Sequence, residues 1–545
     1  MILNSKAVFS ALCVLLTFTS NGEGRPSSSS RALQCSTEQY RPSYHFSPAT
    51  NWLNDPNGMV WYDGVYHLFF QYHPYSTIWG PMHWGHAISS NMVTWEELPI
   101  ALYPDEFGDI FSGSAVVDFT NTSGFQPPQG GDPPIVAIYT SAAGPVQRQS
   151  IAYSLDKGMT FQKYEHNPVL ADETRPDFRD PKVALIDGRW IMSLAVGDKI
   201  EFFSSTNLID WTLDSEFGAN PPEGNHGGVW ECPDLFSFDV QDPDGSTRTL
   251  WVLIVSINPG GPNRGSASQY FVGNFTRNGD TYSFSTYPWS SNQWLDWGPD
   301  NYAGVTFSNE PQGRHIYMGW MNNWIYANNL PTVTWRGQMT LPRQMNLKAL
   351  DPNNVNDPRY RVTSTPVPEL DSLRNPDQHL EITEPINIEP QTVITVTDLA
   401  NFSTPLMELE VTVEIEGQIQ DFSICAFNSA EEESCFGYNN TRHGWYLDRS
   451  KSGNVGFHNE FQQTLNALAT REVNTEQVVI RMFVDVSSLE VFADEGLTSM
   501  TSLHYPSQPF DKIYINNWSS GESNAVLRIS KLNLWGLNCW YEGTA

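Results

Sequence analysis

Residues 44–345 repeat one local pattern, in which short runs of aromatic and β-branched residues alternate with turns rich in Gly, Pro, Asn and Asp. Examples of such runs are residues 135–140 (IVAIYT), 250–255 (LWVLIV) and 315–320 (HIYMGW). Runs of this length and composition, bounded by turn residues, are typical of β-strands. The 3.6-residue spacing of apolar residues in an amphipathic helix is hard to find here. The pattern therefore predicts an all-β fold.

A short phrase recurs within this region, at residues 92–96 (MVTWE), 158–161 (GMTF) and 208–212 (LIDWT). Each copy follows an expected strand and a turn containing Ser or Asn. Recurrence at intervals of tens of residues is typical of repeated small sheets, such as the blades of a β-propeller. The copies differ too much from one another to indicate the number of blades.

The pattern changes after residue 345 and returns near residue 381. Residues 351–380 are rich in turn residues and predict a linker. Further on, residues 409–415 (LEVTVEI) and 478–484 (VVIRMFV) read as half-buried strands, which suit a sandwich of two sheets. We therefore expect a propeller-like domain over residues 36–350, the linker, and a β-sandwich over residues 381–541.

The N-terminus has the features of a secretory signal peptide. Lys6 precedes a short apolar stretch at residues 7–18, and small and polar residues follow up to residue 24. We expect residues 1–24 to be a signal peptide and the protein to be secreted and extracellular. No later stretch is long and apolar enough to cross a bilayer. Glycosylation of a secreted protein is predicted at five N-x-S/T sequons, Asn121, Asn274, Asn401, Asn439 and Asn517.

Five cysteines remain once the signal peptide is removed, too few for a disulfide framework in so long a chain. Cys425 and Cys435 flank a Glu-rich loop and are candidates for a bridge across a hairpin. Cys35 and Cys539 are candidates for a bridge between the termini.

The formal net charge is −31, from 30 basic and 61 acidic residues. A surface of this sign repels phosphate backbones and anionic lipids, so neither nucleic acid nor a membrane is an expected partner. A neutral substrate is easier to reconcile with the charge. Solubility accounts for most of the acidity without any functional role.

Three carboxylates stand out because each lies beside an aromatic residue and a Pro or Cys-Pro. They are Asp55 in 52–58 (WLNDPNG), Asp180 in 178–181 (FRDP) and Glu231 in 230–234 (WECPD). In a propeller the inner strands converge on one axial funnel, so side chains far apart in sequence can meet there. Taken alone, Asp55 has a plainer interpretation as a turn residue, and the Arg179-Asp180 and Trp230-Glu231 pairs as an ion pair and a strand edge.

Converging carboxylates suit glycoside hydrolysis, which needs one ionised and one protonated carboxyl group. We expect the apolar neighbours Trp230 and Cys232 to raise the pKa of Glu231 and suit it to the acid role. We expect Arg179 to keep Asp180 charged. The alternative use of such a cluster, a metal site, lacks EF-hand, HExxH and CxxC spacing, and no G-x-S-x-G nucleophile motif occurs. Neither a metal nor a cofactor is therefore expected.

Ordered motifs along nearly the whole mature chain resemble glycoside hydrolase family 32, the β-fructofuranosidases that include invertases, inulinases and levanases. The resemblance is closest to the secreted invertase and exo-inulinase group. Besides the three carboxylate motifs, the matching segments are residues 79–87, 111–115 (FSGSA), 296–300 (DWGPD), 319–324 (GWMNNW) and 485–492 (DVSSLEVF).

The resemblance implies a five-bladed β-propeller followed by a β-sandwich, and a retaining mechanism. By motif match, Asp55 would be the nucleophile, Glu231 the acid and base, and Asp180 a stabiliser of the oxocarbenium-like state. The terminal-fructose pocket would be lined by Asn54, Gln71, Trp79, Phe111, Ser112, Arg179 and either Trp324 or Trp335. Each of these also has an ordinary structural interpretation as a core, turn or strand-edge residue. Asp234 replaces a Gly of some inulinases, which puts subsite detail in doubt.

Three functions remain open at this stage. The first is a hydrolase that releases terminal β-fructosyl units from sucrose or fructans such as inulin and levan. The second is a fructosyltransferase, and the third is a catalytically silent sugar-binding protein. The intact carboxylate trio favours an enzyme, because a binding protein has no need of all three groups. The sequence indicates neither the preferred chain length nor the oligomeric state.

Overall fold

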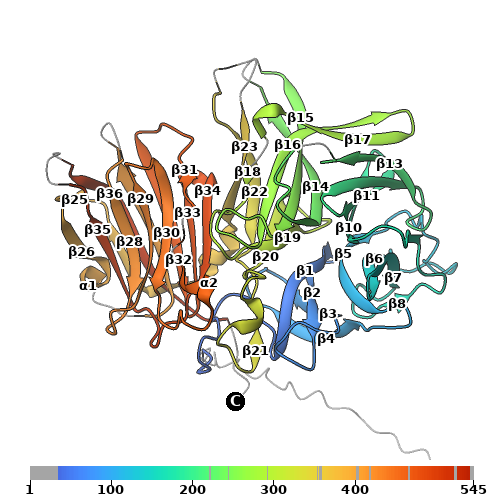
Figure 1. The fold of residues 1–545 in the computed structure, drawn as a ribbon, viewed down its shortest axis with the longest axis horizontal. Helices are drawn as coiled ribbons and strands as arrows, with labels where there is room; N and C mark the ends of the chain where they lie inside the picture. Colours follow the sequence, from blue (N-terminus) through green and yellow to red (C-terminus); the bar gives the residue numbers. More distant parts are fainter. Residues whose placement is uncertain are drawn as a thin grey trace, which may run out of the picture.

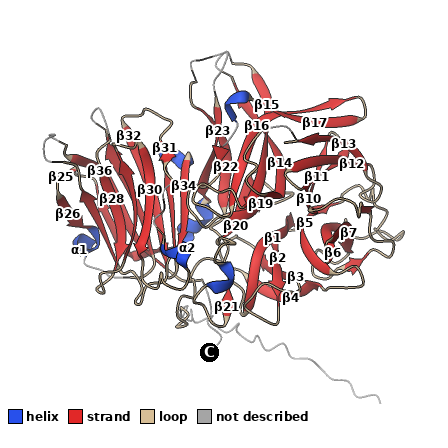
Figure 2. Cartoon of the chain, viewed as in Figure 1, coloured by secondary structure: helices blue, strands red, loops and turns tan. Residues whose placement is uncertain are grey.

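Among the described residues the strands form seven sheets, antiparallel except for one parallel pair in the first sheet, and helices are few and short, as Figure 2 shows. The computed structural model describes residues 35–219, 223–242, 245–290, 293–352, 354, 359–400, 404–415, 419–463, 465, 467–520 and 525–540. The predicted signal peptide, residues 1–24, lies outside these ranges. No helix among the described residues is long and apolar enough to cross a membrane. The all-β prediction is confirmed.

Five sheets of four or five strands follow one another along the first two thirds of the chain and make up what we call the five-sheet unit. Sheet one contains β1 (Asn51–Tyr62), β2 (Val65–His73), β3 (His83–Ser89), β4 (Glu96–Leu102) and β21 (Trp335–Arg336). Sheet two contains β5 (Asp109–Val117), β6 (Ile135–Ala143), β7 (Val146–Ser154), β8 (Gln162–Lys163) and β9 (Leu170–Ala171). Sheet three contains β10 (Phe178–Ile186), β11 (Arg189–Val196), β12 (Lys199–Ser205) and β13 (Thr212–Phe217).

The last two sheets of this unit have the same plan. Sheet four contains β14 (Val229–Gln241), β15 (Thr247–Asn258), β16 (Ala267–Asn278), β17 (Thr281–Thr286) and β18 (Gln293–Trp294). Sheet five contains β19 (Tyr302–Thr306), β20 (His315–Trp320), β22 (Arg343–Ala349) and β23 (Tyr360–Pro366). The 3₁₀ helices η1 (Pro288–Ser290) and η2 (Ala327–Asn329) lie between strands.

The turns explain why these segments fold as hairpins. Asp63-Gly64 joins β1 to β2 and Asp187-Gly188 joins β10 to β11, and all four residues have positive φ. Two successive residues of this conformation match the right-handed twist of the flanking strands, and Asp-Gly adopts it readily. The turn signals of the sequence therefore translate directly into strand ends.

Two larger sheets, the two-sheet unit, contain the rest of the chain and lie beside the five-sheet unit in Figure 1. Sheet six contains β24 (Arg374–Ile382), β25 (Ile386–Ile388), β27 (Met407–Glu414), β32 (Gln477–Asp485), β33 (Ser488–Ala493), β34 (Thr498–Leu503) and β36 (Leu527–Leu537). Sheet seven contains β26 (Thr392–Thr395), β28 (Phe422–Phe427), β29 (Glu433–Asn439), β30 (Gly444–Lys451), β31 (Ala469–Thr470) and β35 (Lys512–Asn517). The short helices are η3 (Pro368–Leu373), α1 (Val396–Ala400), α2 (Asn459–Gln462) and η4 (Asp494–Gly496).

The expected linker at residues 351–380 is shorter in the structure. β23 (Tyr360–Pro366) closes sheet five and β24 (Arg374–Ile382) pairs with β36 at the edge of sheet six, so η3 is the segment that connects the units. Both strands are edge strands with one neighbour each. Their sequences, YRVTSTP and RNPDQHLEI, are rich in polar residues, so neither shows the hydrophobic pattern of a strand, although β23 is largely buried.

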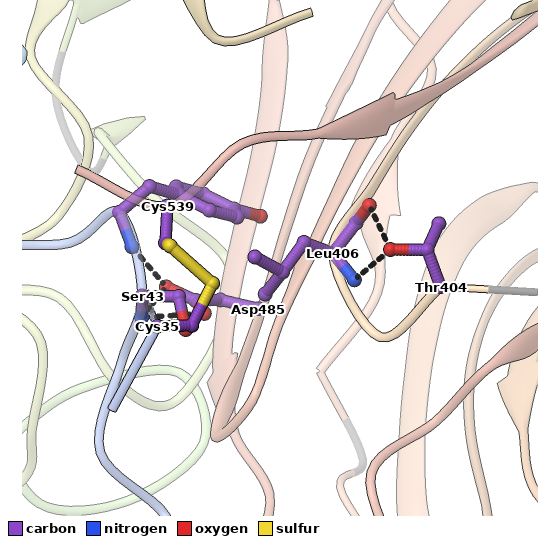
Figure 3. Close-up of a disulfide and its surroundings, with 7 residues drawn as sticks. Cys35, Ser43, Thr404, Leu406, Asp485 and Cys539 are labelled. Carbon is purple, nitrogen blue, oxygen red and sulfur yellow. Dashed lines mark hydrogen bonds between the residues drawn. A yellow bond between two sulfur atoms is a disulfide. The ribbon is translucent and has the colours of Figure 1, made fainter. Parts of the chain in front are cut away.

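Both candidate disulfides are present. Cys425 and Cys435 face each other across β28 and β29, and Cys35 is joined to Cys539, 504 positions later (Figure 3). The second bridge ties the N-terminal segment to the end of the two-sheet unit. Next to it, the Ser43 amide donates a 2.8 Å hydrogen bond to Asp485 Oδ1.

Candidate active site

A cavity of about 280 Å³ is lined by residues of β1, β2, β5, β10 and β14 and of the loops that follow β2 and β20. Its walls contain ten of the eleven residues predicted to act on or bind substrate, and Trp335 is the exception. They are Asn54, Asp55, Gln71, Trp79, Phe111, Ser112, Arg179, Asp180, Glu231 and Trp324. The three carboxylates singled out in the sequence therefore meet in one pocket, although some 175 positions separate the first from the last.

Every first strand of the five sheets carries a β-bulge. At each bulge two residues of the first strand lie opposite one residue of the neighbouring strand, so that one residue is extra. The residues left out of register are Asn54-Asp55 in β1, Phe111-Ser112 in β5, Asp180-Pro181 in β10, Cys232-Pro233 in β14 and Ala303-Gly304 in β19. Bulges redirect side chains and are common beside active sites. Here the bulges of β1, β5 and β10 supply five residues of the pocket wall: Asn54, Asp55, Phe111, Ser112 and Asp180.

Asp55 is held by two donors. Asn54 Nδ2 donates to its Oδ1 at 2.9 Å, and Ser112 Oγ donates to its Oδ2 at 2.6 Å. Asn54 is itself fixed by Trp52, whose indole N–H donates to Asn54 Oδ1 at 2.7 Å. Burial raises the pKa of Asp55, the hydrogen bonds from Ser112 and Asn54 lower it, and the charge of Glu231 raises it; the net shift is upward.

Asp180 lies beneath Asp55 in the same set of contacts. The Cys232 amide donates to Asp180 Oδ2 at 3.1 Å, and the Cys232 thiol sulfur lies 3.6 Å from both Asp180 Oδ2 and Asp55 Oδ2. Burial raises the pKa of Asp180, the charge of Arg179 lowers it, and the charges of Glu231 and Asp55 raise it, to about 7 overall. The expectation that Arg179 keeps Asp180 ionised is therefore wrong, because burial outweighs the cation.

Arg179 pairs instead with Glu231. Its Nε and Nη2 donate to Glu231 Oε1 at 3.1 and 2.8 Å, and its Nη1 donates to Asp177 Oδ1 at 2.5 Å. The phenol of Tyr302, on β19, donates to the other oxygen, Glu231 Oε2. Each oxygen of Glu231 thus has a fixed donor.

The apolar environment expected for Glu231 is not what surrounds it. Alternation along β14 sends Trp230 to the opposite side, into the core, where it stacks on His226 with 5.0 Å between ring centroids. Trp230 is therefore next to Glu231 in the sequence but does not form the surroundings of its carboxylate. The side chains that contact the carboxylate, Arg179 and Tyr302, come from other sheets.

Aromatic rings form the rim of the pocket. The Trp79 ring contacts Phe111 and Trp324 edge to face, with centroids 6.1 and 6.5 Å apart, and Trp324 stacks on the buried Trp52 at 5.9 Å. At the wall, Gln71 Nε2 donates to Asn57 Oδ1 at 2.7 Å, which fixes the direction of its amide. A flat apolar rim over a polar floor suits a sugar ring, which has C–H faces and a hydroxyl perimeter.

The structure decides between the two candidate tryptophans. Trp324 lines the pocket, whereas Trp335 is buried in β21 beside β1, with Arg41 4.7 Å from its ring centroid. Asp234 does not line the pocket. It accepts hydrogen bonds from the Thr306 amide and hydroxyl at 2.6 and 2.8 Å, and it lines a separate cavity of about 320 Å³. Its identity therefore leaves the pocket lining unchanged.

Sequence reasoning missed two groups in the site, Tyr302 and the Cys232 thiol. Tyr302 lies two positions after the 296–300 motif, and Cys232 lies inside the 230–234 motif. The motifs therefore pointed to the right segments of the chain. They did not show which side of its strand Tyr302 or Cys232 faces, because the bulges alter the alternation of side chains.

The predicted glycosylation sites are not equivalent in the fold. Asn121, Asn274 and Asn439 are partly exposed, and Asn401 lies outside the described residues. Asn517 is fully buried, and its Nδ2 donates to the Ile388 and Ala525 carbonyls at 2.9 and 2.8 Å. The prediction for Asn517 is therefore wrong for the folded protein, since the attachment nitrogen is inaccessible.

Comparison with known proteins is consistent with this site. Residues 45–358 match the profile of the glycosyl hydrolases family 32 N-terminal domain, and residues 369–536 match that of the family 32 C-terminal domain. The levanase of Bacillus subtilis is 43% identical over 506 residues, covering 92% of this chain and 71% of the levanase. An extracellular exo-inulinase of Aspergillus niger is 37% identical over 534 residues, covering 91% of this chain and 95% of that enzyme.

Solved structures agree with the sequence matches. Exo-inulinase from Aspergillus awamori superposes with a TM-score of 0.80 at 34% identity, covering 93% of this chain and 99% of that one. Fructofuranosidase from Schwanniomyces occidentalis complexed with fructose superposes with a TM-score of 0.80 at 32% identity, covering 93% of this chain and 99% of that one. The chain therefore belongs to glycosyl hydrolase family 32, and it is a glycosidase of the β-fructofuranosidase type that its motifs indicated.

Proposed function

We propose that the protein is a retaining hydrolase that releases terminal β-D-fructofuranosyl units from sucrose and from fructans such as inulin and levan. The observation that carries the proposal is the meeting of Asp55, Asp180 and Glu231 in one cavity of about 280 Å³. Its size suits one sugar unit bound in a pocket that opens to the surface beside Trp79. The similarity to enzymes named levanase, exo-inulinase and fructofuranosidase supports fructosyl bonds as the substrate.

The roles follow from the contacts. Asp55, oriented by Asn54 and Ser112, attacks the anomeric carbon and forms a fructosyl ester. Glu231 protonates the leaving oxygen and then activates water, which in a retaining enzyme requires about 5–5.5 Å between the two carboxyl groups. Asp180 accepts hydroxyl groups of the fructose and stabilises the positive charge of the transition state.

The pKa of Asp180 fits its role. Burial raises the pKa of Asp180 to about 7 in the empty pocket. Fructose hydroxyl groups that donate to Asp180 favour its ionised form, which is the form that stabilises positive charge.

We also propose that the five sheets are the blades of a propeller and that the two larger sheets form a sandwich. In support, the first strands contact one another in a closed sequence, β1 with β5, β5 with β10, β10 with β14, β14 with β19, and β19 with β1. Such a ring puts five inner strands around one axis. The boundary between the two domains would fall in η3, between residues 366 and 374.

An extracellular location is part of the proposal. The similarity to enzymes named extracellular supports it, and so do two disulfides, which persist in oxidising compartments. The partly exposed Asn121, Asn274 and Asn439 are the sequons that remain available for glycans.

The proposal is tested with sucrose, inulin and levan as substrates. The wild type should release fructose, and nuclear magnetic resonance of the first product should show the β-anomer if the mechanism retains configuration. Asp55→Asn should lose at least about 10³-fold in kcat, since only the attacking charge is removed. Near-wild-type turnover in that variant contradicts the assignment of the nucleophile.

Glu231→Gln gives a second test of the roles. It should impair substrates with poor leaving groups more than activated ones, because only the former need the acid. Oligosaccharide products at high sucrose concentration would identify the transferase alternative. A folded wild type that binds sugar without releasing any product would identify the silent alternative.

A further inference from the structure

Exposed aromatic side chains gather next to the mouth of the pocket. Among the described residues, four aromatic side chains have large exposed fractions: Tyr75 (75%), Phe119 (58%), Tyr103 (52%) and Trp79 (42%). Trp79 lines the pocket, and Tyr75 belongs to the same loop between β2 and β3. Exposed apolar surface concentrated at one place usually marks a binding region.

The topology of sheet one puts these residues on one face. Antiparallel strands alternate in direction, and β1 begins at the pocket, so β2 and β4 end on the pocket side and β3 begins there. Tyr75 follows the end of β2, His83 is the first residue of β3, and Tyr103 follows the end of β4. The strand order β1-β2-β3-β4, which can be followed in Figure 1, therefore places them at increasing distance from the axis.

The three rings form a continuous row. The centroids of Tyr75 and His83 lie 5.9 Å apart, and those of His83 and Tyr103 lie 5.5 Å apart. Both tyrosine rings stand nearly perpendicular to the histidine ring, at 79° and 80°. His83 is 4% exposed and acts as the buried support between two exposed rings. We call Tyr75, His83 and Tyr103 the outer aromatic row.

The loop that carries Tyr75 and Trp79 is fixed at several points. Asn51 Nδ2 donates to the Pro74 carbonyl at 2.8 Å, His73 Nδ1 lies 2.7 Å from the Ile78 carbonyl oxygen, and the Trp79 amide donates to Asn328 Oδ1 at 2.9 Å. Lys163 likewise binds the Tyr103 carbonyl at 2.5 Å. A surface held in place before binding loses little entropy when a ligand arrives.

We propose that the outer aromatic row binds the part of a fructan chain that extends out of the pocket, one or more sugar units beyond the bond that is cleaved. The proposal deepens the proposed function and rests on it. Tyrosine offers a rigid apolar face with a polar tip, which suits the C–H faces and hydroxyls of a neutral sugar. Tyr75 and Trp79 belong to one loop, so a polymer that leaves the pocket past Trp79 can extend to the row, whereas sucrose has no further sugar units. The row thus selects for polymeric substrates.

The test compares long and short substrates. In Tyr75→Ala and Tyr103→Ala, kcat/KM for long-chain inulin or levan should fall at least about fivefold, while kcat/KM for sucrose changes less than about twofold. Comparing inulin with levan shows which linkage the row accommodates. Phe119→Ala is the matched control, because Phe119 is equally exposed but follows the end of β5 that points away from the pocket.

A binding measurement separates this proposal from the catalytic one. In an Asp55→Asn background, native electrophoresis in gels containing inulin or levan should show retarded migration, and Tyr75→Ala should abolish most of the retardation. If the wild type hydrolyses nothing yet is retarded through Tyr75, the proposed function fails and the surface stands. Equal losses on sucrose and polymer, or unchanged polymer kinetics and retardation in both tyrosine variants, would overturn the surface.

Discussion

Glu231 shows how one side chain depends on partners that lie far from it in the sequence. Its two oxygens are occupied by Arg179, from sheet three, and by Tyr302, from sheet five. These two donors fix the direction of the carboxylate, so its position in the pocket depends on the packing of sheets three and five against sheet four.

Tyr302→Phe tests this dependence. Loss of one hydrogen bond to a charged group should lower kcat about tenfold. Because Tyr302 fixes one oxygen of Glu231, the loss should be larger for substrates with poor leaving groups than for activated ones. Steady-state kinetics on both kinds of substrate measures the difference, and thermal unfolding checks that the fold is intact. Equal losses on both would mean that Tyr302 only fills space.

At the scale of elements, the repeated feature is the bulge in each inner strand. β5 is a clear case: Gly113 follows the bulge, and a Cβ atom built there would lie 2.1 Å from the Ile138 carbonyl oxygen of β6. The close approach of the two backbones holds the bulge in position. The bulge in turn directs Ser112 to Asp55 Oδ2, 2.6 Å away.

Gly113→Ala should therefore damage the site from outside it. The added methyl group forces β5 and β6 apart, so kcat/KM should fall by up to about 100-fold through misplacement of Ser112 and Asp55. The free energy of unfolding should fall by about 1–3 kcal/mol. Gly456→Ala is the control, since a methyl group added at Gly456 would meet no atom within 4 Å. Wild-type kinetics in Gly113→Ala would show that the strands can separate without moving the site.

At the scale of the whole molecule, buried charges join the two units. His45 lies between Asp485 and Glu490, at 2.7 and 2.8 Å, and Glu490 also binds Arg343 of sheet five. Burial lowers the pKa of His45, but the hydrogen bonds and charges of the two acids outweigh it and raise the pKa to about 9. The 485–492 motif therefore acts as the anchor of the junction, since it supplies both acids.

His45 makes the stability of this junction depend on pH. A folded-state pKa above the unfolded value of 6.5 gives stability that is fully present below about pH 6.5 and lost as the pH rises through about 9. The contribution is on the order of 3 kcal/mol. His45→Gln should be less stable than the wild type at pH 6.5, and the difference should shrink by pH 9.5. Thermal unfolding at a series of pH values measures this, and parallel curves for the two proteins would contradict it.

The sequence by itself offered both disulfide pairs only as candidates, but it determined most of the strands and hairpin turns, and ten of the site residues that it predicted line the pocket. These depend on local properties, namely side-chain alternation, Asp-Gly turns and ordered motifs, which survive without knowledge of contacts. It also separated the two units, although edge strands such as β23 and β24 were too polar to recognise.

Only the tertiary structure decided the partner of each side chain. Arg179 serves Glu231 rather than Asp180, Trp324 reaches the pocket while Trp335 does not, and Asn517 is buried inside the two-sheet unit. The reason is geometric: adjacent residues of a strand face opposite sides, and one extra residue in a bulge reverses that assignment. Neighbours from other sheets then set the charge and hydrogen bonding of every group in the site, and no local pattern records them.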